Sequence, residues 1–287
     1  MSDMSLSEAI NGPSRCVSSG AYRIQDAFSE GKALVAFLTG GDPTLELSYE
    51  YICALIKGGV DLIEIGIPFS DPIAEGPIIQ EASLRALKAG TTIDALFDLV
   101  RKLRRGCGTN EAPLSTPLLF MGYLNPIFHY GYERFFFACA EAGVDGIVIA
   151  DLPFDEQEEV REYASAHGIA LISLIAPTSA ARIQTIAREA EGFIYLVSSL
   201  GVTGQRLEIT TDLSSIISLI REVTDVPVAV GFGIHTPEQA YNISRLADGV
   251  IVGSAIVQRI AESPEGAAEA LFDYARHMKQ AMIPLSL

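Results

Sequence analysis

The chain has 287 residues, 49% of them apolar and 20% charged, which suits a large buried core and excludes an intrinsically disordered chain. Its 20 Lys and Arg and 36 Asp and Glu give a formal net charge of −16, which argues against nucleic-acid and membrane-surface partners because those surfaces are anionic. No apolar run reaches the ~18 residues that span a bilayer. The polar, Ser-rich residues 1–20 lack the basic and apolar segments of a secretory signal, so we expect a cytoplasmic protein.

The cysteines and histidines are too dispersed to predict a metal centre. The four cysteines are Cys16, Cys53, Cys107 and Cys139, and none forms a C-x-x-C pair. Zinc sites usually show such close spacing. We therefore expect no metal and reduced thiols throughout, as is usual in cytoplasmic proteins.

Short apolar runs alternate with longer amphipathic stretches along the chain. A helix is predicted over 22–29, before the first run. The runs predict buried strands at 33–38, 61–67, 117–121, 146–150, 170–175, 193–197, 226–230 and 249–252. The stretches between and after them predict helices at 47–57, 78–89, 93–104, 131–142, 156–167, 180–190, 213–223, 237–246 and 265–282.

This alternation predicts an α/β fold with an all-parallel sheet. Eight strands, each followed by helix, fit a single-domain (β/α)8 TIM barrel over residues 21–287, with a polar tail over 1–20. The helix at 22–29 would then plug the bottom of the barrel. A doubly wound open sheet is the alternative, because periodicity does not distinguish the two.

Glu64 is an unusual residue for a buried strand. With alternating faces, Ile63 and Ile65 point toward the helices, whereas Leu62 and Glu64 point into the barrel. A carboxylate in that position is costly unless it has a partner or a chemical role. Glu64 is therefore either held in a hydrogen-bond network or acts as a general acid and base whose pKa is raised by an apolar pocket.

The loop that follows this strand contributes two further carboxylates. Residues 68–77 contain Asp71 and Glu75 among three prolines and a glycine. Acidic residues here can simply cap the next helix. Glu75, close to the helix start, can also reach the mouth of the barrel.

Three successive glycine-rich loops follow the last strands. They are S-S-L-G-V-T-G at 198–204, G-F-G-I at 231–234 and G-S-A at 253–255. A single glycine indicates only a turn, but three such strand ends, with a helix N-terminus after the last, predict a phosphate site formed by main-chain N–H groups.

Large side chains at the strand ends suggest a flat apolar slot. Phe37, Tyr123, Tyr195 and Phe232 fall at these positions, beside the expected carboxylate and phosphate site. Each alone is ordinary core material. Together they predict a pocket for a planar aromatic phosphate ester.

The motifs together resemble the tryptophan synthase α subunit family. The similar segments are T-G-G-D-P at 39–43, E-I-G-I-P-F-S-D-P at 64–72 and the three glycine motifs, and the resemblance runs from about residue 20 to residue 282. It implies retro-aldol cleavage of indole-3-glycerol phosphate to indole and glyceraldehyde 3-phosphate. It also implies no cofactor in this chain and a β subunit, carrying pyridoxal phosphate, as partner in an α2β2 complex.

The resemblance also implies a role for each site residue. Glu64 is the family's acid and base, and Glu75 stands where the family has an aspartate that stabilises charge on the indole nitrogen. Thr203 resembles a lid residue. The phosphate ligands implied are Gly204, Gly233, Gly253 and Ser254. The indole slot implied is formed by Phe37, Met121, Tyr123, Ala150, Ile175, Tyr195, Phe232 and Ile251.

Three other functions remain open from the sequence. The chain can be a free-standing lyase that releases indole. It can be a weakened α-like subunit that mainly binds and activates the β subunit, with Glu75 as a sign of decay. It can also be another phosphate-binding barrel, such as a sugar-phosphate isomerase.

Overall fold

The computed structural model describes residues 18–108, 112–197, 212–231 and 233–283. Within these residues all eight expected strands form, and the fifth is divided in two at Ile172. The strands are β1 (Ala33–Thr39), β2 (Leu62–Gly66), β3 (Leu118–Gly122), β4 (Gly146–Ile149), β5 (Ala170–Leu171), β6 (Ser173–Ile175), β7 (Ile194–Val197), β8 (Val228–Gly231) and β9 (Gly249–Val252).

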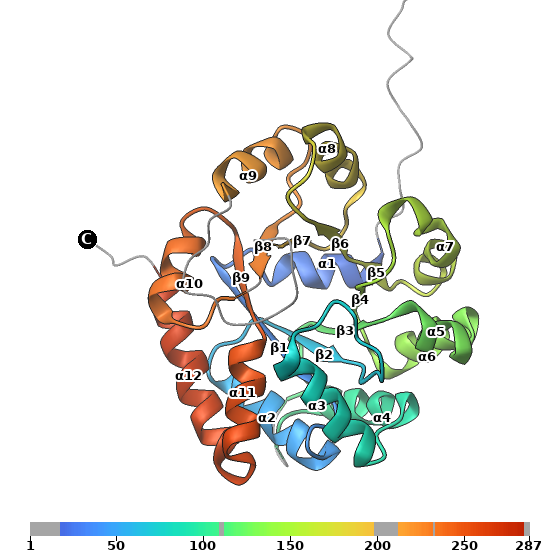
Figure 1. Cartoon of the computed structure of the whole chain (residues 1–287), viewed down its shortest axis with the longest axis vertical. Helices are drawn as coiled ribbons and strands as arrows, with labels where there is room; N and C mark the ends of the chain where they lie inside the picture. The colour runs from blue at the N-terminus through green and yellow to red at the C-terminus, as the bar shows by residue number, and fades with distance from the viewer. Residues whose placement is uncertain (1–17, 109–111, 198–211, 232, 284–287) are drawn as a thin grey trace, which may run out of the picture.

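The strands form one parallel sheet in the order β5-β4-β3-β2-β1-β9-β8-β7-β6. The first strand therefore lies between the second and the last, and the two ends of the order, β5 and β6, are separated by a single residue. The sheet thus curls into a nearly closed barrel ringed by helices (Figure 1). This confirms the TIM-barrel prediction and excludes the doubly wound sheet, whose first and last strands do not pair.

One helix, α1, precedes the strands, and the others follow them around the outside (Figure 1). They are α1 (Ser19–Asp26), α2 (Leu45–Lys57), α3 (Pro77–Lys88), α4 (Ile93–Arg104), α5 (Leu124–Tyr130), α6 (Tyr132–Ala142), α7 (Glu158–Ala166), α8 (Ala180–Glu189), α9 (Leu213–Arg221), α10 (Pro237–Ser244), α11 (Ser254–Glu262) and α12 (Ala267–Met282). Short 3-10 turns lie at Phe154–Glu156 and Pro264–Gly266. The short helix α5 was not predicted from the sequence, and Gly131, with a positive φ of 90°, separates it from α6.

Strand alternation divides the core into two layers. Ile63 and Ile65 pack in the layer between strands and helices, whereas Leu62 lies in the barrel interior, as predicted. The predicted placement of Ile175 inside the barrel is wrong. Ile175 packs in the outer layer, and Leu174 faces the interior because it shares a strand face with Ile172.

The helix α1 closes the bottom of the barrel. Its Ala21 and Ile24, together with the following Phe28, pack in the interior with residues from the first positions of the strands, such as Ala33. The helix begins three residues earlier than predicted, because the Ser18 hydroxyl accepts the Ala21 N–H and caps it. The apolar plug fixes which end of the barrel is left open for a site.

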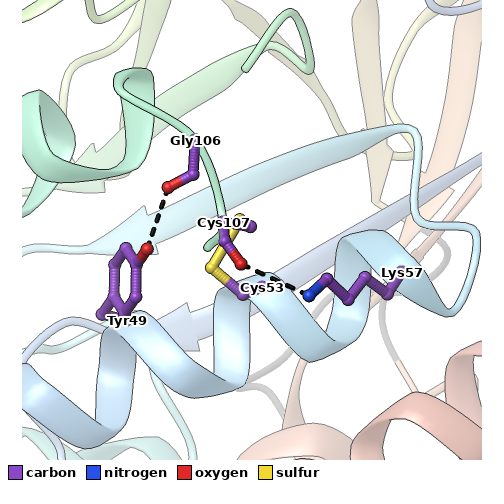
Figure 2. Close-up of a disulfide and its surroundings, with 5 residues drawn as sticks. All are labelled: Tyr49, Cys53, Lys57, Gly106 and Cys107. Carbon is purple, nitrogen blue, oxygen red and sulfur yellow. Dashed lines mark hydrogen bonds between the residues drawn. A yellow bond between two sulfur atoms is a disulfide. The ribbon is translucent and has the colours of Figure 1, made fainter. Parts of the chain in front are cut away.

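The expectation of reduced thiols is wrong for one pair of cysteines. Cys53 on α2 and Cys107 after α4 form a disulfide, with Cα atoms 5.2 Å apart (Figure 2). The Tyr49 hydroxyl donates to the Gly106 carbonyl at 2.8 Å and the Lys57 amine donates to the Cys107 carbonyl at 3.3 Å, which fastens the loop to α2. The cysteines are far apart in sequence, but α2 and α4 pack as neighbours on the barrel. Cys139 is free and buried, and Cys16 lies outside the described residues.

Candidate active site

Glu64 occupies the barrel interior at the centre of β2. It pairs in register with Phe37 on β1 and Leu119 on β3, and it has 0% exposed surface. Neither carboxylate oxygen has a hydrogen-bond partner. Burial, and then the charge of Glu75, raise the pKa of Glu64 to about 8. The alternative of a carboxyl satisfied by a hydrogen-bond network is therefore wrong.

Glu75 is brought to the same region by the loop after β2. It is 4% exposed. Its N–H donates to the Pro72 carbonyl at 3.0 Å, and Gln80 on α3 donates to its carbonyl at 2.7 Å. The Ala74 N–H donates to the Tyr123 hydroxyl at 3.1 Å, so three separate contacts hold this backbone segment.

The charges of the two carboxyl groups act on two tyrosine hydroxyls nearby. Burial and the charge of Glu75 raise the pKa of the Tyr123 hydroxyl. Burial and the charges of Glu64 and Glu75 raise the pKa of the Tyr195 hydroxyl. Tyr195 lies on β7 and Tyr123 directly follows β3, so the charge of Glu75 acts on phenols from two other parts of the barrel.

An apolar slot lies beside the carboxyl groups. Phe37, Met121 and Tyr123 line a small cavity with Glu75, which Pro72, Ile79, Thr39, Gly66, Ile67, Ser83 and Gly122 complete. A Cβ on Gly66 would lie 2.8 Å from the Phe37 ring, so a glycine is needed for this packing. Tyr195 and Ile251 face the interior, and Ala150 lines a neighbouring cavity with Leu174. Phe232 lies outside the described residues.

Two of the expected phosphate loops lie side by side. Gly233, with a positive φ of 84°, follows β8, and Gly253 follows the adjacent β9 and precedes α11. In the helix that begins at Ser254, the Ile256 and Val257 N–H groups donate to the Gly253 carbonyl, whereas the first N–H groups of a helix have no acceptor within it and suit an anion. A Cβ on Gly253 would lie 3.2 Å from the Phe37 ring, so this helix start borders the apolar slot. Gly204 and Thr203 lie outside the described residues.

Two features of this region were not predicted from the sequence. The Asp42 carboxylate, from the loop after β1, binds Arg85 of α3 through two hydrogen bonds of 2.8 Å, which ties that loop to the helix that follows Glu75. The Thr39 hydroxyl, at the end of β1, lines the same cavity as Glu75. Alternation from Phe37 to Thr39 was the available signal, since it places both side chains on the inner face.

In the segments that the structure describes, no group of three or more His, Cys, Asp and Glu side chains is placed to hold a metal ion. No helix in those segments is both long and apolar enough to cross a membrane.

A family model described as tryptophan synthase alpha chain matches residues 25–283, which include every strand and both candidate carboxylates. The chain belongs to the tryptophan synthase alpha chain family. An alpha chain from Lacticaseibacillus casei is 43% identical over 260 residues, covering 91% of this chain and 95% of that protein. An alpha chain from Lactiplantibacillus plantarum is 47% identical over 256 residues, covering 89% and 94%.

Solved structures agree with this family assignment. The tryptophan synthase alpha chain of Legionella pneumophila superposes with a TM-score of 0.80 at 37% identity, covering 91% of this chain and 97% of that one. A chain of the tryptophan synthase complex of Pyrococcus furiosus gives a TM-score of 0.77 at 35% identity, covering 87% and 99%. The family members thus share the whole barrel with this chain.

Proposed function

We propose that this chain cleaves indole-3-glycerol phosphate to indole and glyceraldehyde 3-phosphate. The observation that carries the proposal is Glu64, a fully buried carboxyl without a partner that faces the interior, beside a second carboxyl group. A pKa of about 8 gives it both protonation states near neutral pH, as general acid–base catalysis requires. Membership of the tryptophan synthase alpha chain family supplies the substrate.

In the cleavage reaction the substrate gains one proton and loses another. Protonation of the indole ring carbon that carries the side chain forms an indolenine, and loss of the adjacent hydroxyl proton then lets the carbon–carbon bond break to an aldehyde. Glu64 donates the first proton and accepts the second in this proposal. The Glu75 carboxylate stabilises the positive charge that develops on the indole nitrogen.

The surrounding residues orient the substrate. In the proposal, the indole ring lies in the slot of Phe37, Met121 and Tyr123, with Ala150, Tyr195, Phe232 and Ile251 around it, and Leu174 replaces Ile175. The phosphate binds main-chain N–H groups at Gly233, Gly253 and Ser254, completed by Gly204. Thr203 belongs to the segment that closes the site. Such positioning accounts for a large share of catalysis in enzymes of this kind.

The partner proposed is a tryptophan synthase β subunit, in an α2β2 complex. The structural neighbours include a chain of the Pyrococcus furiosus tryptophan synthase complex. In this proposal the pyridoxal phosphate belongs to the β subunit, which receives the indole, and this chain needs no cofactor of its own.

The test is indole formation from indole-3-glycerol phosphate, measured with and without a β subunit. Wild-type protein should release indole, and Glu64→Gln should reduce kcat at least 1,000-fold, the order expected when an acid–base group is lost. Glu158→Gln, an exposed glutamate on α7, is the matched control and should keep full activity. An active Glu64→Gln protein would remove the catalytic assignment.

The same assay separates the other functions. Full turnover that a β subunit does not change would favour a free-standing lyase. No turnover by wild type, combined with a faster β reaction, would instead identify a subunit that only activates its partner.

A further inference from the structure

The barrel mouth holds an unusual concentration of unsatisfied polar atoms. Among the described residues, the buried side-chain atoms without a hydrogen-bond partner are the Thr39 hydroxyl, both oxygens of Glu64 and the Arg161 Nε. Thr39 ends β1 and pairs in register with Gly66, two residues beyond Glu64 on the neighbouring strand. Three of the four atoms therefore belong to two residues on the inner faces of two adjacent strands.

Burying a hydroxyl group without a hydrogen-bond partner lowers the stability of a fold. Threonine hydroxyls rotate freely and usually find a backbone carbonyl, and a group that finds none destabilises the fold. Thr39 is 1% exposed, so bulk water does not satisfy it. Valine has the same shape and would avoid the free-energy cost of an unsatisfied hydroxyl. The presence of threonine therefore indicates that the hydroxyl forms a hydrogen bond in another state of the protein.

The cavity that Thr39 lines identifies the group it can reach. Glu75 lines the same small cavity, as does Ser83 of α3. The two hydrogen bonds between Asp42 and Arg85 fasten the loop that follows Thr39 to α3, whose first turn follows Glu75. The Asp42–Arg85 pair therefore connects the segment that carries Thr39 to the helix that follows Glu75.

We propose that Thr39 is a positioning residue for Glu75 and donates its hydroxyl hydrogen to the Glu75 carboxylate when the substrate fills the slot. The hydrogen bond would fix the orientation of a carboxylate that is one methylene longer than an aspartate. A hydrogen bond to an ionised group is stronger than a neutral one, and a fixed carboxylate stabilises developing charge better than a mobile one. This inference rests on the proposed function.

The test compares Thr39→Val and Thr39→Ser with Thr185→Val, a control on α8 whose exposed hydroxyl bonds to the Ala181 carbonyl. Thr39→Val should lower kcat about tenfold or more with little change in KM, since the lost interaction forms in the transition state. Thr39→Ser should recover activity to within about threefold, and Thr185→Val should match wild type. The Tm of Thr39→Val should equal or exceed that of wild type, because an unsatisfied hydroxyl is removed.

A second comparison shows whether Thr39 acts through Glu75. In a Glu75→Gln background, Thr39→Val should change kcat by less than about threefold, because the ionised acceptor is gone. A tenfold loss in that background as well would overturn the inference, as would wild-type kcat in Thr39→Val or a loss of Tm that Thr39→Ser does not restore. If wild type cleaves the substrate and Thr39→Val has the same kcat, only the role of Thr39 is refuted. Wild-type protein without any turnover removes the proposed function and this inference together.

Discussion

Replacing Glu64 by glutamine keeps the size of a fully buried side chain and removes its titratable proton. The fold raises the pKa of this carboxyl from 4.5 to about 8, mainly through burial and then through the charge of Glu75. Between these pH values the folded chain binds a proton that the unfolded chain has lost. The free energy of unfolding of wild type must therefore fall as pH rises.

The size of this effect follows from the shift. At ~1.36 kcal/mol for each pH unit, a rise from 4.5 to about 8 removes about 5 kcal/mol of stability between those pH values. The favourable contribution is complete below pH 4.5 and is lost as pH rises through 8. Glu64→Gln does not titrate, so its stability relative to wild type should increase by that amount, of order several kcal/mol, from pH 4.5 to pH 9.

Urea unfolding of both proteins at pH 5, 7 and 9, followed by circular dichroism, measures the difference. Subtracting the two curves cancels the other titrating groups and the constant cost of burying an amide. Glu158→Gln, at the protein surface, should parallel wild type at every pH. Parallel curves for wild type and Glu64→Gln would refute the claim that Glu64 is forced to ionise in an apolar interior.

Three other substitutions test the remaining geometry. Glu75→Asp should lower kcat about tenfold, because the shorter side chain withdraws the carboxylate by ~1 Å from its position in the cavity. Equal or faster turnover would show that the cavity does not require the longer side chain. Cys107→Ser should lower the free energy of unfolding by about 4 kcal/mol for a loop of this length, in denaturant titrations without reductant, and added reductant should bring wild type to the same value. Gly66→Ala should raise the KM for substrate, because the new Cβ would lie 2.8 Å from the Phe37 ring and push it into the slot; an unchanged KM would place the ring of the substrate elsewhere.

The strand and helix pattern was predictable because it depends on local periodicity. The helix at Ile93–Arg104 has the predicted bounds, and the face of β2 that carries Glu64 follows from simple alternation. The short α5 and the inward face of Leu174 were not predicted. The helix α5 depends on Gly131, whose positive φ separates it from α6. Leu174 continues the inner face of Ala170 and Ile172, and a shift of one residue to Ile175 reverses the side-chain direction.

The sequence by itself determined that this chain forms alternating strands and helices and places a carboxyl group on the inner face of the second strand. Hydrophobic period and the chemistry of each side chain suffice for that. Only the tertiary structure decided that Cys53 meets Cys107, that Glu75 approaches Glu64 closely enough to raise its pKa, and that Thr39 is left without a partner. These facts depend on distances between residues remote in sequence, which are set when the sheet closes and the helices pack around it.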